Sequence, residues 1–484
     1  MTIIRESVQS SLPPRAGSET LYRSLPLQNS DVTREGPLSF CQELLLFNEI
    51  FTGYPPAVSR VAHIDGPLDI DAFRRAADST IAGHEPLRTT WTWRQGEPVA
   101  QVKSADSLPP STTVTELAAD SRGILEGLVA AVPTLLAAGR PPHMRHWLFR
   151  RSENDHIWMF ATHHMAADAI SLKLYAETFC SSYVRPLSDS PKPTTSIEYA
   201  QALRTWLDSS DAQAELNWWL CKLEAVPRVA IPVRPPVEQS NVSLERQELR
   251  LPTVLRNAVV QTARSNRAPL AAVFLATYAQ VASNRGAFPC VITNVPGRSL
   301  PGAASTSGAC YNSVPLVLSS NVSDSTAISA AANTLFDALD HQNVPAPLIS
   351  LGAVRRGGLA LPDLIPVTFN VIDHPLKDFR LSRCRLWDFD LTTHGSTTLG
   401  YSGPTVLRFG KAPSKPTMDW TMCMLPESVV VTLEYSPCYA DRKDVALLLA
   451  SYEAALRSIC RVPDGATDDR GAPILIADWS VSRE

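Results

Sequence analysis

Residues 159–171 read MFATHHMAADAIS, and the two adjacent histidines in this stretch, His163 and His164, decide how the chain is interpreted. The run that contains them, DHIWMFATHH (155–164), is mostly apolar and has the pattern of a β-strand. The run that follows, AISLKLYAETFCSSYV (169–184), favours a helix. The histidine pair is therefore predicted to lie on a strand-to-helix connection.

Strand geometry disfavours a metal site built on this pair. Successive side chains of a strand point to opposite faces, so His163 and His164 do not share a cavity if the strand continues through residue 164. Asp168 offers a third ligand, and His143 and His146 are the nearest further histidines. The spacing of these two suits a helix, whereas their surroundings have a strand pattern, so they complete no closed ligand set. We expect no metal.

Two interpretations of the pair stay open from the residues alone. In one, a histidine is a satisfied member of an apolar strand and Asp168 caps the helix that begins near residue 169. In the other, one histidine faces a cleft as a base, while its neighbour and Asp168 hold the loop. Imidazole suits that task because its unperturbed pKa of about 6.5 lies near working pH.

Motifs of other chemistries are absent. The chain has no G-x-S-x-G, no G-x-x-x-x-G-K-[ST] and no G-x-G-x-x-G. A Ser–His–Asp triad stays open because triads are defined in space, but no serine stands out.

Composition limits the classes of partner and compartment. The 484 residues are 44% apolar, enough for a large core divided over two or three domains. The net charge is −4 and no dense basic run occurs, so we expect no nucleic-acid partner. The nine cysteines are dispersed without a C-x-x-C, which is typical of reduced thiols in a cytoplasmic protein. Because no apolar signal core and no apolar run of about 18 residues occurs, we expect no membrane segment.

The order of elements predicts an extension followed by two α/β lobes. Residues 1–35 are polar and aperiodic, and we expect an N-terminal extension there. A linker-like run, RPLSDSPKPTTS, begins at residue 185 and separates a first lobe over 36–190 from a second over 191–484. Strands and helices mix in both halves, which favours two sandwich-like lobes over a single sheet.

Two segments predict long helices. PLSFCQELLLFNEIF (37–51) has apolar residues at positions 40, 44, 47 and 51, which form one helical face. SIEYAQALRTWLDSSDAQAELNWWLCKL (196–223) is predicted to be one long helix.

Several motifs occur in an order that one enzyme family shares. HHMAADA (163–169) is similar to the signature H-H-x-x-x-D-G, which follows a strand. PLSFCQELLLF resembles P-L-S-x-x-Q, and GPLDIDAFRRAADSTIAGHEPLRTTW follows G-P-L-D…L…L-x-x-x-H-x-x-L-R-T-x-F. LNWWLCKL, GRSLPGAASTSGACYNSVPLVL, IPVTFNVID and VVVTLEYSPCYAD are similar to the later motifs. Over residues 36–462, the chain thus resembles the condensation domains of nonribosomal peptide synthetases.

This resemblance implies a fold and a reaction. The family has two lobes like chloramphenicol acetyltransferase, arranged as a V-shaped pseudodimer with a central tunnel. An acyl or aminoacyl thioester on the phosphopantetheine arm of a carrier protein is transferred to an amine or hydroxyl acceptor, giving an amide or ester in natural-product biosynthesis. The resemblance implies that the reaction proceeds without a covalent enzyme intermediate and without a bound cofactor. Because the chain begins with Met and shows no adenylation or carrier segment, we expect a free-standing, monomeric, cytoplasmic acyltransferase with an acyl or peptidyl carrier protein as partner.

The resemblance also implies roles for single residues. His164 takes the place of the family's central histidine, which removes a proton from the attacking nucleophile or orients it. His163 is implied to be structural and packed away. Asp168 is implied to pair with Arg298 in the other lobe rather than act as a base. Asn312 lies where the family has a tunnel-facing asparagine, although capping a strand end is an equal alternative.

The chain departs from the family pattern at three points. Ala169 replaces the glycine of the signature, Leu44 stands where an arginine is usual, and the polar stretch 385–417 has no clear match. We expect that stretch to include a loop bridging the lobes. Ala169, on the substrate tunnel, is predicted to be helical and harmless, since alanine is strained only at positive φ. If it is not, the alternative is a catalytically degenerate fold that serves as a docking or recruitment module. A related epimerase would need an added glutamate, which no feature singles out.

Overall fold

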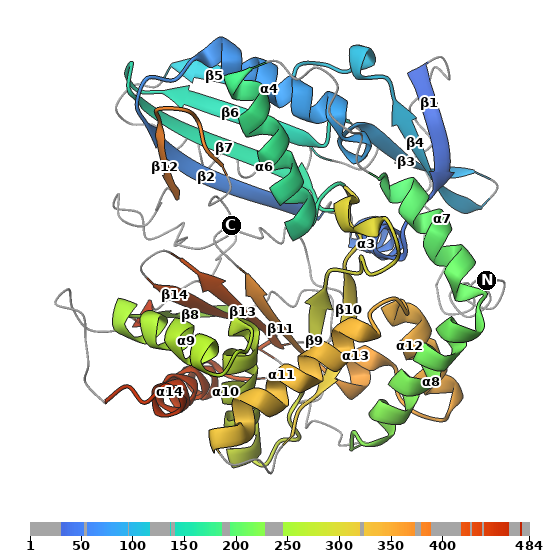
Figure 1. Cartoon of the computed structure of the whole chain (residues 1–484), viewed down its shortest axis with the longest axis vertical. Helices are drawn as coiled ribbons and strands as arrows, with labels where there is room; N and C mark the ends of the chain where they lie inside the picture. The colour runs from blue at the N-terminus through green and yellow to red at the C-terminus, as the bar shows by residue number, and fades with distance from the viewer. Residues whose placement is uncertain are drawn as a thin grey trace.

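The chain folds into two lobes, seen above and below the centre of Figure 1. The computed structural model describes residues 31–52, 56–94, 96–116, 136, 141–185, 194–227, 245–319, 324–372, 379–388, 418–425, 428–437, 440–463 and 475–476. The prediction of two mixed α/β lobes is confirmed.

The first lobe is built on a five-stranded sheet covered on one face by two helices (Figure 1). Its strand order is β12–β2–β7–β6–β5, from β12 (Arg385–Asp388), β2 (Ala57–Asp65), β7 (Asp155–His163), β6 (Met144–Arg150) and β5 (Thr112–Glu116). The covering helices are α4 (Ile70–Gly83) and α6 (Ala169–Val184). Asp69 caps α4 by accepting a hydrogen bond from the Ala72 N–H, as the acidic start of that segment favours. A smaller sheet of order β1–β4–β3 stands beside them, from β1 (Val32–Pro37), β4 (Glu97–Lys103) and β3 (Thr89–Arg94).

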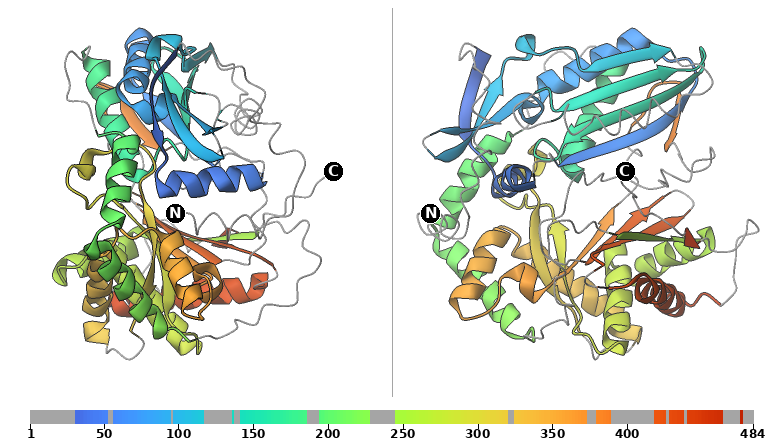
Figure 2. Two further views of the ribbon diagram at one scale, coloured as in Figure 1. Left: turned by 90° about the vertical axis from the view of Figure 1, so that its right-hand side faces the viewer. Right: turned by 180° about the vertical axis from the view of Figure 1, so that it is seen from behind.

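The second lobe has a seven-stranded sheet of order β10–β9–β11–β13–β14–β8–β15. Its strands are β10 (Asn312–Val317), β9 (Cys290–Val295), β11 (Val367–Ile372), β13 (Met418–Met424), β14 (Val429–Tyr435), β8 (Glu245–Leu251) and β15 (Leu475–Ile476). Helices α10 (Leu270–Asn284), α11 (Asp324–Asp340) and α14 (Arg442–Ile459) cover the face turned away from the first lobe (Figures 1 and 2). Further helices in the described residues are α3 (Phe40–Thr52), α7 (Ser196–Leu207), α8 (Ser210–Glu224), α9 (Thr253–Ser265), α12 (Ala346–Arg355) and α13 (Leu361–Leu364).

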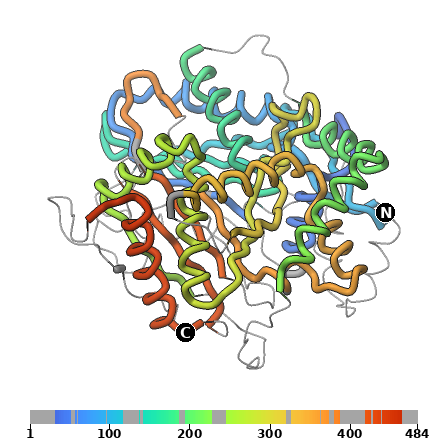
Figure 3. The backbone as a smooth tube through the Cα atoms, turned by 60° about the horizontal axis from the view of Figure 1, so that its bottom comes forward, coloured from blue at the N-terminus to red at the C-terminus, as the bar shows by residue number. Residues whose placement is uncertain are grey.

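The structure corrects the predicted lobe boundaries. The boundary after residue 35 falls inside β1, because that strand begins at Val32 and pairs with β4. Residues 379–388 belong to the first lobe although they follow most of the second. Phe379 packs there against Trp158, and β12 pairs antiparallel with β2. Figure 3 shows this orange segment beside the blue and teal chain of the first lobe. The predicted boundary at 190/191 lies outside the described residues, as does most of the stretch 385–417.

Two helix predictions are also corrected. The predicted single helix over 196–223 is two helices, α7 and α8, because Ser209 caps a new start by accepting from the Ala212 N–H. Helix α3 (Phe40–Thr52) is present as predicted, but the apolar positions 44 and 47 of the predicted face are exposed, and position 51 has no described side chain. Leu44 is 51% exposed, whereas Leu46 is 1% exposed.

One buried ion pair joins the two lobes next to the histidine motif. Both terminal guanidinium nitrogens of Arg298 contact the carboxylate of Asp168, Nη1 at 2.7 Å from Oδ2 and Nη2 at 2.9 Å from Oδ1. Arg298 also donates to the carbonyls of Thr306 and Gly308. The second lobe makes a further hydrogen bond to the same carboxylate: the Cys310 N–H donates to Asp168 Oδ2 at 3.0 Å. A pair so fully hydrogen-bonded is expensive to break from one side.

We predict that Asp168→Asn lowers the free energy of unfolding by about 3–5 kcal/mol, because it leaves the Arg298 charge buried without a counter-charge. Asparagine keeps an oxygen that caps α6, so the loss reports the charge rather than the cap. Urea titration followed by intrinsic fluorescence measures it. The matched control is Glu224→Gln in the surface pair with Arg356, which is expected to cost less than about 1 kcal/mol. Equal losses of unfolding free energy in the two variants would contradict the role given to the buried Asp168–Arg298 charge pair.

Candidate active site

The histidine motif forms a tight turn between a strand and a helix. Strand β7 ends at His163, and α6 begins at Ala169. Asp168 is the N-cap of α6, where its side chain accepts from the Ser171 N–H at 2.9 Å. Residues 164–168 therefore have both ends fixed, one by the sheet and one by the capped helix that the ion pair holds.

His164 lies in this turn with one ring nitrogen occupied and the other left as an acceptor. The main-chain N–H of His164 donates to the Pro56 carbonyl at 2.8 Å. The ring Nδ1 of His164 lies 2.9 Å from the Ala167 carbonyl oxygen. Because a carbonyl oxygen only accepts, Nδ1 carries the proton and Nε2 carries the lone pair. Burial lowers the pKa of His164 below its ordinary value of 6.5. The ring is thus a neutral base at neutral pH.

His163 points into the first lobe and is fully buried. Its Nδ1 accepts from the Met165 N–H at 3.1 Å, so its proton is on Nε2. That nitrogen lies 2.9 Å from Oε2 of Glu49, a buried carboxylate on α3. His163 has no free ring nitrogen for chemistry.

Ala169 is the first residue of α6 and is exposed. Among the described residues other than glycine, positive φ occurs at Arg267, Ser382 and Arg461, so Ala169 is in ordinary helical conformation. The position therefore does not need glycine, as predicted.

Asn312 lines a hollow, but its side chain is fully engaged in hydrogen bonds to main-chain groups. Its Nδ2 donates to the carbonyls of Gln342 and Val344, at 3.0 and 2.6 Å. Its Oδ1 accepts from the N–H groups of Ser313 and Ala346, at 3.0 and 2.9 Å. The bonds at the start of β10 and of α12 favour the structural alternative that the sequence left open.

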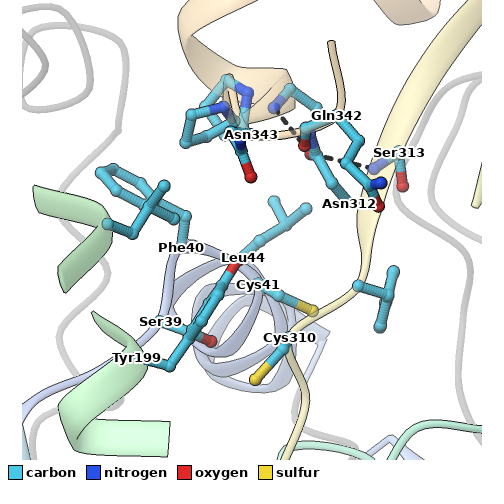
Figure 4. A pocket seen from close by; sticks show the side chains of 15 residues that line it. Ser39, Phe40, Cys41, Leu44, Tyr199, Cys310, Asn312, Ser313, Gln342 and Asn343 are labelled. Atoms are coloured by element: carbon cyan, nitrogen blue, oxygen red, sulfur yellow. Dashed lines mark hydrogen bonds between the residues drawn. The ribbon is translucent and has the colours of Figure 1, made fainter. Parts of the chain in front are cut away.

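The hollow beside Asn312 is lined by side chains from both lobes (Figure 4). Ser39, Cys41 and Leu44 line it from α3 and the residue before it, and Tyr199 from α7. Tyr311 also lines it, and the ring of Tyr311 lies 5.5 Å from that of His164 between centroids. Tyr311 thus connects this hollow to the candidate base. Ala169 does not line it.

Two cysteine side chains line the same hollow, Cys41 and Cys310. Burial raises the pKa of both thiols, so they stay protonated. A protonated thiol is a poor nucleophile.

The histidines considered as metal ligands serve the first lobe's core. Nε2 of His143 lies 2.6 Å from the Thr89 carbonyl oxygen, and His146 accepts from the Trp158 indole N–H. Burial lowers the pKa of His146 to about 3. In the part of the chain that the structure describes, no group of three or more His, Cys, Asp or Glu side chains is placed to hold a metal ion. No helix among these residues is long and apolar enough to cross a bilayer.

Sequence reasoning assigned no role to three polar residues on or beside α3, although two of them, Ser39 and Gln42, are the S and Q of the P-L-S-x-x-Q motif. Ser39 Oγ donates to the Ala309 carbonyl of the second lobe, Gln42 Nε2 donates to the Met165 carbonyl, and Glu49 pairs with His163. Their spacing of three and seven residues places them on one helical face, which was the available signal. The apolar residues between them made this polar face difficult to recognise in the sequence.

Comparison with known proteins agrees with this geometry. A family model described as Condensation domain matches residues 32–371. A linear gramicidin synthase protein of Brevibacillus parabrevis is 23% identical over 475 residues, which cover 92% of this chain and 9% of that protein. The chain therefore spans less than a tenth of that relative's length.

Two solved structures share the fold. The first condensation domain of the calcium-dependent antibiotic synthetase, in complex with substrate analogue 3a, has a TM-score of 0.68 at 17% identity and covers 92% of this chain and 100% of that one. The SgcC5 protein from Streptomyces globisporus has a TM-score of 0.66 at 19% identity, covering 88% and 99%. At these identities the likeness shows the fold. With the family match over most of the chain and the histidine turn held between two such lobes, the chain belongs to the condensation-domain family.

Proposed function

We propose that the protein is an acyltransferase that joins a carrier-bound acyl or aminoacyl thioester to an amine or hydroxyl acceptor. The observation that carries this proposal is the tautomer of His164. Its Nδ1–H is committed to the Ala167 carbonyl, so the lone pair on Nε2 is available to a nucleophile. Condensation domains act on substrates attached to carrier proteins, which supports a carrier protein as the partner.

The proposed reaction needs a base and an activated acyl group. His164 Nε2 accepts the proton of the amine or hydroxyl as that group attacks the thioester carbonyl. The tetrahedral intermediate then expels the pantetheine sulfur, which leaves as a thiol after taking up a proton. Because the thioester is already activated, the proposal includes no bound cofactor and no metal. It places the enzyme in the cytoplasm, where the reducing environment suits the eight described cysteines, all of which are free.

The alternative of a degenerate docking module finds no support at the position that suggested it. Ala169 is unstrained at the start of α6, and the Asp168–Arg298 pair is intact beside it. No observation therefore favours the alternative over an active enzyme.

His164→Ala is expected to lower product formation by about 10²–10⁴-fold, the usual contribution of a general base. Mass spectrometry of the product from an acyl-loaded carrier protein and candidate acceptors measures it, and also distinguishes an amide from an ester. The matched control is His341→Ala, which removes a histidine stacked on Trp218 in the second lobe. Wild-type turnover by the His164 variant would refute the proposed base.

The acid limb of the pH–rate profile is expected below pH 6.5. Only the neutral imidazole accepts a proton, and burial lowers the pKa of His164, so activity is lost as the pH falls through that lowered pKa. The dependence of kcat/KM on pH measures it. A hydroxyl acceptor is used, because it does not titrate in this range while an amine does. A limb centred above the ordinary histidine pKa would contradict the assignment.

A further inference from the structure

Met165, the residue that follows His164, is hydrogen-bonded through both its main-chain N–H and its main-chain carbonyl. The Met165 N–H donates to His163 Nδ1 at 3.1 Å. The Met165 carbonyl accepts from Gln42 Nε2 at 2.9 Å and from the Ala309 N–H at 3.2 Å. A single residue therefore carries three hydrogen bonds that no regular secondary structure requires.

Two of these bonds connect Met165 to α3, one directly through Gln42 and one through His163, which contacts Glu49. Gln42 is on this helix, and so is Glu49, which orients the His163 ring by accepting from its Nε2–H. The two side chains are seven residues apart, close to two helical turns, so they lie on one face. Both are buried, Gln42 at 1% and Glu49 at 4% exposure. Figure 2 shows α3 lying between the two lobes, where it reaches the turn.

Burying a carboxylate and an amide here is costly, and apolar side chains of similar volume would pack at lower cost. Stability alone therefore does not explain the polar face of α3. These side chains fix the orientation of their partners. The carboxylate of Glu49 fixes the plane and tautomer of the His163 ring, and the amide of Gln42 fixes the Met165 carbonyl.

We propose that Glu49 and Gln42 are positioning residues for the reaction and that, with His163, they form a clamp that sets the place of His164. This α3 clamp, defined as Gln42, Glu49 and His163, acts through the Met165 peptide and does not touch substrate. Its kinetic role rests on the proposed function of His164, whereas its geometry does not.

The link to His164 runs through the turn itself. The Ala166 N–H donates to the His163 carbonyl at 2.9 Å, and the Ala167 carbonyl accepts from the ring of His164. If the Met165 peptide moves, the Ala167 carbonyl moves with it, and the proton of His164 is no longer confined to Nδ1. A displacement of about 1 Å at such a point costs on the order of 10²-fold in rate.

The first test is independent of activity. In protein labelled with ¹⁵N-histidine, long-range ¹H–¹⁵N spectra at neutral pH distinguish the two imidazole tautomers. We expect His163 as the Nε2–H form and His164 as the Nδ1–H form, and we expect Glu49→Leu to leave each ring as a mixture. Wild-type His163 protonated on Nδ1 would overturn the clamp, whether or not any variant folds.

The second test is kinetic and uses a conservative rescue. Glu49→Leu and Gln42→Leu are expected to lower kcat by about 10–100-fold with KM unchanged, because the clamp places the base and not the substrate. Glu49→Gln keeps an oxygen that accepts from His163, so it is expected to retain most of the wild-type kcat. Glu43→Gln is the matched control on the same helix, since that carboxylate pairs with Arg204.

Circular dichroism establishes that each variant is folded. Equal losses in Glu49→Leu and Glu49→Gln, or a folded Glu49→Leu with wild-type kcat, would overturn the positioning role. If His164→Ala retains full activity, the proposed base fails, while the tautomer measurement still decides the clamp.

Discussion

A carboxylate and a guanidinium, Asp168 and Arg298, meet in the interior of the protein, and the arrangement of the site depends on this contact. Removing both charges from water is unfavourable, and their attraction offsets that cost only when the remaining hydrogen-bonding capacity is used. Here it is used. Ser171 and Cys310 donate to Asp168, while Arg298 reaches the Gly308 carbonyl. One residue thus caps a helix of the first lobe and docks the second.

The turn that carries His164 takes its shape from constraints on both sides. The ion pair fixes its helical end, and the Glu49–His163 contact fixes its strand end. Between them, His164 bonds to two main-chain carbonyls, those of Ala167 and Pro56. A base held in this way keeps one tautomer without a carboxylate of its own. Burial lowers the pKa of His164, so the ring is neutral, as the proposed role of proton acceptor requires.

Local pattern was sufficient to predict the strand that ends at the histidine pair, the connection after it and the helix that follows, because each depends on residues close in sequence. It left the cap at Asp168 as one of two alternatives. The resemblance to a family added Arg298, which periodicity cannot relate to Asp168. The face of α3 was predicted wrongly for a physical reason. Its buried side carries Gln42 and Glu49, so counting apolar residues favoured the side where Leu44 is exposed. Nor did any local signal place residues 385–388 in the first lobe, since strand pairing at such separation depends on the whole fold.

The crossing of β12 into the first lobe has a consequence for how the chain is made. On the ribosome, the edge of β2 that β12 later covers is synthesised long before Arg385 leaves the exit tunnel. At about 5–20 residues per second, that interval is on the order of tens of seconds. Throughout it, the nascent first sheet presents an open row of backbone donors and acceptors, a template for pairing with another chain. The first lobe is thus closed only by a segment of the chain that is translated after most of the second.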